Sequence, residues 1–508
     1  MDSKEVGVEP SQRVDDAKTN DVEQHIESAT MTGEKNAEDV QRLDALSFQY
    51  TKKEEARFLL KIDIIVLGYV SGAYILAYMD RGNIGNANVA GMSKDLGITD
   101  GQYQWLLTVL YLGYILFDWQ TVFYKIFPAR YYVPTVIIIW GIIAGACGAA
   151  QNFAGMLVLR LLLGIFESAY APGLAYFFSF FYYRKEMGRR LGWYVSIAPL
   201  AASFAGAFAF FVTLHHHAIA GWRALFLVEG LPAIAVGLFG YYWLPSNALD
   251  CQFLNETERK IAAARTVRQT GNRERGHTVN LKDMLGSLLD LKNWVPTIIY
   301  FMMNVGYSSL PIYIPTILQG MGYSSIHAQG LSAPPYLFAC LIVLLVGHLS
   351  DRFQRRGIFL AICSGTGAIG YLVLVLVHNV GVKYFALFLI TGGLYPCIGL
   401  VLSWVANNNG SDSKRGAGFI LMNFVGQCGP LLGTHIFPAS QGPLYKKGFY
   451  ISFGACTIAS CLSIVQIFQL MYLNKKLDEK YGPARQAVHT EDEIGEETDG
   501  NENFRYIL

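Results

Sequence analysis

Charged residues are scarce in this chain. Only 16% of its 508 residues are Asp, Glu, Lys or Arg, and 52% are hydrophobic, whereas soluble domains carry about 25% charged residues. The mean hydropathy is +0.30. A formal net charge of +1 also argues against a nucleic-acid partner held by charge. The composition predicts a membrane protein.

Several motifs that carry chemistry are missing. The eight cysteines show no zinc-type or thioredoxin-type spacing, and no P-loop or dinucleotide-binding fingerprint is present. We therefore expect no metal, no cofactor, no primary ATP drive and no enzymatic activity. Residues 1–50 lack a basic start followed by an apolar core, so no cleaved signal peptide is expected there.

Long apolar runs are what the sequence has instead. A bilayer core about 30 Å thick needs about 20 apolar residues per helix. Six such runs precede a polar stretch and six follow it, which predicts an all-α membrane protein with twelve transmembrane helices in two six-helix halves. The runs lie near 62–80, 102–124, 131–150, 154–182, 190–213, 222–244, 294–319, 328–349, 358–378, 382–405, 416–438 and 448–473.

The Lys and Arg residues of the loops predict the orientation. Alternate short loops carry eleven and six of them, and the richer set belongs on the cytosolic side, so both termini are expected to be cytosolic. The predicted organisation is a disordered cytosolic N-tail (1–50), an N-terminal half (51–244), a cytosolic central loop (245–292), a C-terminal half (293–473) and an acidic disordered cytosolic C-tail (474–508).

One short loop has a near-diagnostic pattern. The stretch "GHLSDRFQRRG", between the eighth and ninth runs, resembles the G-x-L-x-D-R-x-x-R-R-G loop of the major facilitator superfamily. Asp351 beside the Arg cluster can form charge-assisted pairs that stabilise one conformational state. The resemblance implies the major facilitator fold and a gating role for Asp351, Arg352, Arg355 and Arg356. The alternative is a merely basic inner loop.

Further stretches resemble one branch of that superfamily. "EEARFLLKID", "YMDRGNIGNANVAG", "RLLLGIFESAYAPG", "GWRALFLVEG", "FLNETER", "WVANNNGSDSKR" and "GPLYKKGF" together are similar to the anion:cation symporter family, in particular its fungal allantoate/nicotinate/pantothenate permeases. One departure is Trp119-Gln120-Thr121, where many relatives have Pro-Ser-Asn. The bend of the second helix is therefore left open.

Two acid–base sets lie in the first half. Arg160 and Glu167 are seven residues apart in the fourth run, about two helical turns, so both project from one face about 10 Å apart, with Gly164 leaving room between them. Asp80 and Arg81 lie nearer the outer end of the first run. Charges inside a span are costly and usually face a cavity or the bundle interior. Structural pairing of the first set, and simple hydration of the second, are the alternatives.

The resemblance implies roles for these residues. Arg81 and Arg160 would bind the substrate carboxylate, while Asp80 and Glu167 would carry the coupled proton. Asn304, Tyr307 and Asn423 would line the second-half wall of the cavity, with ordinary packing as the alternative. Arg223 and Glu229 of the sixth run read as architectural.

The function expected from the sequence is proton-coupled symport of a small organic anion by alternating access, driven by the proton gradient. Nicotinate, pantothenate and allantoate are the kinds of substrate that the resemblance implies. The expected partners are this anion, the proton and the lipid bilayer, with a functional monomer in the plasma membrane. Export of an organic acid or secondary metabolite is one alternative, and a nutrient receptor that signals without transport is another.

Overall fold

The computed structural model describes residues 48–214, 219–270, 286–409, 412–442, 445–482 and 505–508. Every regular element in these ranges is helical, which confirms the predicted fold class. Within the same ranges, eight helices are long and apolar enough to cross a membrane. The chain divides into two compact units, residues 1–66 with 244–278 and residues 67–243 with 279–508.

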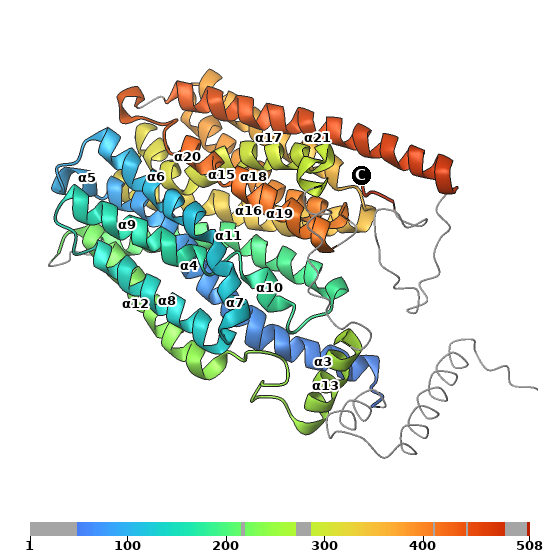
Figure 1. The fold of residues 1–508 in the computed structure, drawn as a ribbon. Coiled ribbons are helices and arrows are strands. Elements are labelled where there is room, and N and C mark those ends of the chain that lie inside the picture. The colour runs from blue at the N-terminus through green and yellow to red at the C-terminus, as the bar shows by residue number, and fades with distance from the viewer. Residues whose placement is uncertain (1–47, 215–218, 271–285, 410–411, 443–444, 483–504) are drawn as a thin grey trace, which may run out of the picture. The chain divides into compact units, whose positions relative to one another are not determined.

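The larger unit contains the twelve predicted spans apart from residues 62–66 of the first and residue 244 of the sixth, and each span holds at least one helix (Figure 1). The first six are built from α4 (Gly68–Val89), α6 (Asp100–Phe117), η2 (Asp118–Val122), α7 (Phe123–Ile126), α8 (Ala129–Cys147), α9 (Phe153–Ser168), α10 (Leu174–Phe178), α11 (Arg184–Leu214) and α12 (Gly221–Trp243), with the short α5 (Met92–Asp95) between the first two spans.

The second six spans follow in the same order along the chain. They are α15 (Leu291–Gly320), α16 (Ser325–Phe353), α17 (Arg356–Leu376), α18 (Val380–Asn407), α19 (Asp412–Gly426) with α20 (Gly429–Gly433), and α21 (Lys446–Tyr481), with the short η3 (Ala439–Gln441) before the last. Helices α17 and α21 lie side by side (Figure 1).

The first span ends later than the apolar pattern predicts. The apolar run stops near residue 80, but α4 continues to Val89 through a stretch rich in Gly and Asn. Small residues let helices approach closely in membranes, and Gly82 and Gly85 face Pro311 and the Ile312 backbone of α15. Asp80 and Arg81 therefore lie in the middle of a helix and not near its outer end, which corrects the sequence interpretation.

The second span bends without a proline. Helix α6 ends at Phe117 and a 3-10 segment replaces it over Asp118–Val122. The side-chain amide of Gln120 donates to the Ile165 carbonyl of α9 at 2.8 Å. The bend left open by the sequence is therefore present, and Gln120 ties it to the fourth span.

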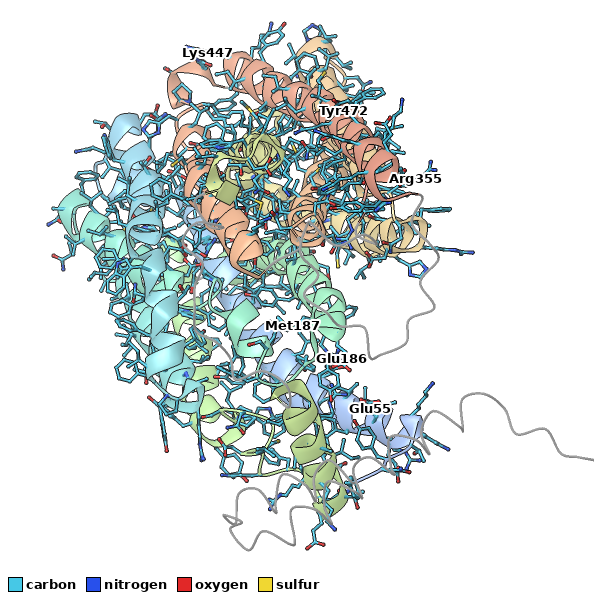
Figure 2. The ribbon with its side chains drawn as sticks, turned by 45° about the vertical axis from the view of Figure 1, so that its right-hand side comes forward. Glu55, Glu186, Met187, Arg355, Lys447 and Tyr472 are labelled. Carbon is cyan, nitrogen blue, oxygen red and sulfur yellow. The ribbon has the colours of Figure 1, made fainter. Side chains whose placement is uncertain are left out.

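The outer surface of the larger unit is apolar. Leu238, Ile369 and Phe468 are among many large hydrophobic side chains that are more than half exposed. Tyr472 lies on the outer side of α21 (Figure 2), toward the helix end that is predicted to be cytosolic. Aromatic side chains commonly mark the lipid–water boundary. Such a surface suits a lipid environment.

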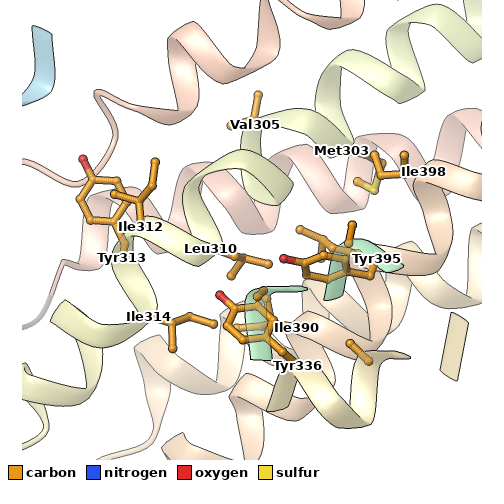
Figure 3. Close-up of a cluster of buried hydrophobic side chains, with 14 of the residues drawn as sticks. Met303, Val305, Leu310, Ile312, Tyr313, Ile314, Tyr336, Ile390, Tyr395 and Ile398 are labelled. Atoms are coloured by element: carbon orange, nitrogen blue, oxygen red, sulfur yellow. The ribbon is translucent and has the colours of Figure 1, made fainter. Parts of the chain in front are cut away.

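The core of the second half packs around α15. Met303, Leu310 and Ile390 belong to one buried cluster, in which Tyr336 and Tyr395 lie close together (Figure 3). The two rings meet edge to face with centroids 5.8 Å apart. Aromatic side chains thus reach from the core of this half toward the first half.

Small residues form tight seams between helices of the first half. Gly141 and Gly145 of α8 face Gly230 of α12 so closely that a Cβ on Gly230 would lie 2.6 Å from a backbone atom of each. Gly164 of α9 packs directly against the Leu110 carbonyl of α6. The space expected beside Gly164 is therefore filled by a neighbouring helix, which corrects the sequence interpretation.

The smaller unit contains α3 (Lys52–Ile62) and α13 (Glu256–Thr270). Thr51 and Glu54 form a capping box at the start of α3, which satisfies free backbone donors at that end. Lys61 pairs with Glu258 at 2.7 Å, and Glu55 pairs with Arg265. Burial alone would raise the pKa of the Glu258 carboxyl, but Lys61 and the Asn255 N–H hold it below its ordinary value.

Residues 505–508 pack onto the helix ends of the second half. The Ile507 carbonyl accepts hydrogen bonds from the Trp404 indole at 2.8 Å and the Asn408 amide at 3.1 Å. The backbone of Tyr506 exchanges two hydrogen bonds with Asn474 of α21. This short segment connects α18 with α21. These four residues of the predicted tail thus have defined contacts, whereas residues 1–47 and 483–504 lie outside the described residues.

Candidate functional site

The site begins with an ion pair between two helices of the first half. Arg81 of α4 donates through Nε to Oε1 of Glu167 on α9. The Glu167 side chain is only 1% exposed, and that of Arg81 is 18% exposed. The Arg81 guanidinium also lies 4.6 Å from the ring centroid of Tyr114 on α6, a cation–π arrangement. Arg81 therefore binds a carboxylate already, although it is not fully enclosed.

Arg160 occupies a different environment. It is 1% exposed, and its NH1 donates to the backbone carbonyl of Asp80 at 3.2 Å. Its guanidinium carbon lies 5.2 Å from the ring centroid of Phe226 on α12. Within the described chain, neither Nε nor NH2 has a hydrogen-bond partner. A fully buried cation thus keeps donors that an anion could occupy.

Asp80 and Arg81 are neighbours in sequence but face different helices. Asp80 is 3% exposed and its Oδ2 has no hydrogen-bond partner in the described chain. It interacts electrostatically with Arg160 and Glu167 and lies beside Trp140 of α8. Successive residues point about 100° apart on a helix, which is why the two charges do not pair with each other.

Glu229 of α12 completes the buried group. It is 3% exposed, and electrostatic interactions connect it with Asp80 and Arg160. Asn83 of α4 lies beside it and is itself fully buried. Neither oxygen of Glu229 has a hydrogen bond of full geometry in the described chain. The sequence analysis interprets Glu229 as architectural. A charge in the middle of an apolar run is, however, a functional candidate by default.

Arg223, the other sixth-span charge, has the architectural contacts that the sequence suggested. Its NH1 donates to the carbonyls of Gly148 and Ala150 at 2.8 and 2.9 Å. These carbonyls lie just beyond the end of α8. Arg223 therefore caps a helix end by hydrogen bonding.

A narrow cavity lies where the two arginines meet the second half. It is lined by Arg81, Arg160, Tyr111, Ile312 of α15 and several aliphatic residues of α4 and α6. The free space holds about one water molecule. An organic anion would need the surrounding helices to separate before it could reach both guanidinium groups.

The two halves close against each other on one side of this cavity. Gln329 of α16 accepts from Thr213 of α11 at 2.6 Å and donates to the Asn86 carbonyl of α4 at 3.2 Å. The hydroxyls of Thr108 on α6 and Thr434 after α20 lie 2.9 Å apart. These contacts form a polar closure at the end of the bundle where α4 ends and α6 begins.

Tyrosines connect the halves at the level of the arginines. The hydroxyls of Tyr78 on α4 and Tyr395 on α18 share a hydrogen bond of 3.0 Å. Tyr307 of α15 lies between them, with ring centroids 6.1 Å from Tyr78 and 4.8 Å from Tyr395. Sequence reasoning selected Tyr307 but missed the other two, because tyrosines in apolar runs carry no signal of their own.

The other residues predicted for the second-half wall are less central. Asn304 is buried, and its amide donates to the Gly426 carbonyl at 3.3 Å. Asn423 of α19 is half-buried, and its carbonyl accepts the Gln427 N–H at 2.9 Å. Neither residue lines the cavity that contains the two arginines.

The predicted gating loop has one internal ion pair. Arg356 donates to Asp351 at 3.0 Å, and the Asp351 side chain is 63% exposed. Arg352 and Arg355 are exposed. Gln354 adopts a left-handed backbone conformation with φ of 51°, which produces the sharp reversal between α16 and α17.

The described residues contain no group of three or more His, Cys, Asp or Glu side chains that could hold a metal ion.

The described helices form a bundle with an apolar surface, and a narrow cavity lined by two arginines of the first half borders Ile312 of the second half. The profile described as Major Facilitator Superfamily matches residues 70–434. The chain belongs to the Major Facilitator Superfamily. It is a multi-pass membrane transporter and not an enzyme.

Fungal transporters are similar to the chain along most of its length. It is 31% identical over 465 residues to the "Major facilitator-type transporter hxnP" of Emericella nidulans, which covers 89% of this chain and 93% of that protein. It is 27% identical over 470 residues to the "High-affinity nicotinic acid transporter" of Saccharomyces cerevisiae, with 89% and 85% covered.

Solved structures share the fold. A bacterial homolog of the human lysosomal transporter Spinster, in an inward-facing and unoccupied conformation, superposes with a TM-score of 0.63 at 15% identity and covers 83% of this chain and 99% of that chain. A D-xylose-proton symporter has a TM-score of 0.61 at 12% identity, with 79% and 97% covered. At these identities the similarity concerns the fold alone.

Proposed function

We propose that the chain is a proton-coupled symporter of a small organic anion, of the anion:cation symporter type. The observation that carries this proposal is the single cavity lined by both Arg81 and Arg160, with buried carboxylates beside each. A guanidinium recognises a carboxylate through two parallel hydrogen bonds. Two such groups in one enclosed space suit an anion far better than a neutral sugar or a cation.

The substrate class is a monocarboxylate vitamin or nitrogen source such as nicotinate, pantothenate or allantoate. Tyr111 lines the cavity and Tyr114 lies against the Arg81 guanidinium, so a flat ring acid has aromatic surfaces beside its carboxylate site. This favours a nicotinate-like substrate within the class. The printed name of the Saccharomyces cerevisiae relative points the same way.

Coupling follows from competition for Arg81. An incoming carboxylate that binds Arg81 displaces Glu167, and a displaced carboxylate in a buried site is costly unless it takes up a proton. Anion and proton then bind together, and both leave when Glu167 re-forms its ion pair. With both termini cytosolic, the polar closure formed by Gln329 and Thr108 lies on the outer side, so the cavity would open inward.

Transport by alternating access requires the two halves to rock about the central site. The outer closure must open, while the tyrosine contact between Tyr78 and Tyr395 must separate or slide. Because one chain contains both halves, a monomer suffices for this cycle. The plasma membrane is the location proposed here, because uptake of a nutrient from outside the cell occurs there.

The test is Glu167→Gln in purified protein reconstituted into proteoliposomes, with labelled nicotinate and an imposed proton gradient. The variant should lose accumulation against the substrate gradient but retain counterflow exchange, because a neutral Gln leaves Arg81 free for the anion. Glu479→Gln, at an exposed position near the end of α21, is the matched control and should accumulate normally. Uphill uptake by Glu167→Gln would refute the coupling role.

The same vesicles separate import from export. Net uptake driven by an inward proton gradient supports the importer, whereas outward extrusion with no driven uptake supports the exporter. A receptor that does not transport would show neither net uptake nor exchange, which would refute the proposed function.

A further inference from the structure

Three buried carboxylates and two guanidinium groups share the site. Arg81 forms an ion pair with Glu167. Arg160 interacts electrostatically with all three carboxylates, Asp80, Glu229 and Glu167, without forming an ion pair with any of them in the described chain. The described residues of this cluster therefore carry one negative charge in excess if every group is ionised.

An uncompensated charge at this depth is expensive. Asp80 and Glu229 are each 3% exposed, and burying an unpaired ion costs several kcal/mol. Asp80 Oδ2 and both oxygens of Glu229 also lack hydrogen bonds of full geometry in the described chain. Trp140 lies beside Asp80 and Asn83 beside Glu229, but neither of these donors forms a hydrogen bond of full geometry in the described chain, so two full charges would be poorly stabilised here.

Two charged groups interact with Glu229, namely Asp80 on α4 and Arg160 on α9. Cys147 on α8 interacts with both of these groups, and Glu167 on α9 interacts with Asp80. On the helix of Glu229 itself, Arg223 is committed to the carbonyls at the end of α8. Arg160 is thus the one described cation that interacts with this carboxylate pair, since no electrostatic partner of opposite charge other than Arg160 acts on Glu229.

We propose that Asp80 and Glu229 together hold one resident proton in this conformation, and that Glu229 is a second proton-coupling residue of the carrier. The proton makes the cluster neutral: Arg160 balances one carboxylate of the pair, and the other is a carboxylic acid. The acid can donate a hydrogen bond to the neighbouring Asn83 side chain, both of whose amide atoms lack a hydrogen bond of full geometry.

The resident proton also explains how Arg160 becomes available to substrate. While the pair is singly ionised, Arg160 balances one negative charge and keeps Nε and NH2 without protein partners. If the proton left, two carboxylates would compete for this cation and repel an incoming anion. The role in transport rests on the proposed function, whereas the resident proton itself does not.

Infrared spectroscopy of the purified protein in lipid tests the proton directly and without substrate. A protonated carboxyl group has a C=O stretching band that a carboxylate lacks. At neutral pH the wild-type protein should show this band, and both Asp80→Asn and Glu229→Gln should lose it. In each variant the remaining carboxylate pairs one to one with Arg160 and stays ionised.

Further variants sharpen the assignment. Arg160→Gln removes the one described cation that interacts with the pair, so both carboxylates should be protonated and the band should grow about twofold. Glu479→Gln should leave the band unchanged. The shared proton would be refuted if neither Asp80→Asn nor Glu229→Gln lost the band, or if only one of them lost it.

The two variants also protect the test against a folding defect. Size-exclusion chromatography identifies which of them folds, and one folded variant that keeps the full band is sufficient to overturn the proposal. If the infrared result holds but proteoliposomes show no proton-driven nicotinate uptake, the resident proton stands and the proposed function fails. The two outcomes are therefore distinguishable.

Discussion

Arg81 of α4 and Glu167 of α9 form an ion pair across two helices, with the carboxylate almost fully buried and the guanidinium still bordering the central cavity. Under the proposed function, this ion pair brings the group that binds the substrate into direct contact with the group that binds the proton. Arg81 can leave this pair only when a proton or another cation compensates the charge of Glu167. Glu167 can leave only when another anion compensates the charge of Arg81. The pair is therefore a physical basis for coupling two solutes.

Arg81→Lys should weaken substrate binding while preserving the charge. A Lys ammonium cannot reproduce the two-pronged hydrogen bonding of a guanidinium, and one hydrogen bond to a charged group contributes about 1.5–3 kcal/mol. We expect KM for nicotinate to rise about 10- to 100-fold. Arg352→Lys, at an exposed loop position, is the control. An unchanged KM in Arg81→Lys would mean that Arg81 does not contact the substrate.

Gly164→Ala should destabilise the first half. A Cβ at this position meets the Leu110 carbonyl of α6, and backbone atoms cannot move aside as a flexible side chain could. Overpacking typically costs about 1–3 kcal/mol, so the melting temperature in detergent should fall. Gly145→Ala is the matched control, because no atom lies within 4 Å of its added Cβ. Equal melting temperatures for the two variants would contradict the packing described here.

Gln329→Leu should open the polar closure between the halves. The change removes the hydrogen bonds to Thr213 and Asn86, worth about 0.5–1.5 kcal/mol each. In a cysteine-free background, Ser332→Cys should then react faster with an impermeant maleimide. Gln319→Leu is the control, since the Gln319 side chain bonds only to Ser325 of the same half among the described hydrogen bonds. A labelling rate that responds equally to both changes would argue against a specific closure.

Acidification should loosen the packing of α3 on α13 in the smaller unit. The pKa of Glu258 lies below its ordinary value of 4.5, because the opposing hydrogen bonds from Lys61 and Asn255 outweigh burial. A lowered folded-state pKa stabilises at pH values above 4.5, and this contribution disappears as the pH falls through the lowered value. The protection factors of the α13 amides, which are hydrogen-exchange rates corrected for the intrinsic effect of pH, should therefore fall below pH 4.5. Lys61→Met should remove most of this pH step, and an unaltered step would show that another group is responsible.

Much of the fold could be predicted from the sequence, because apolar runs of membrane-spanning length are a direct physical requirement. The polar continuation of α4 was missed, since Gly and Asn resemble a loop until the partner helix α15 is known. The same limitation applies to Gly164, whose neighbour Leu110 lies about 50 residues away in the chain.

The candidate site was predicted in part. Charges inside apolar runs identified Asp80, Arg81, Arg160 and Glu167, but their pairing depends on helix rotation, which spacing within one helix does not reveal. Glu229 is also a charge inside an apolar run, but the sequence interpretation assigns it an architectural role. Its position beside Arg160 became visible only through the contact between α12 and α4.

The close glycine packing between α8 and α12 provides a reference for measuring conformational change in this protein. A Cβ at Gly230 would collide with the backbone of α8, so we expect these two closely packed helices to move together as one rigid unit. A pair of spin labels on their lipid-facing sides, at Ile142 and Leu238, would keep a constant separation through the whole cycle. This constant distance would be an internal reference for the label distances that change during transport.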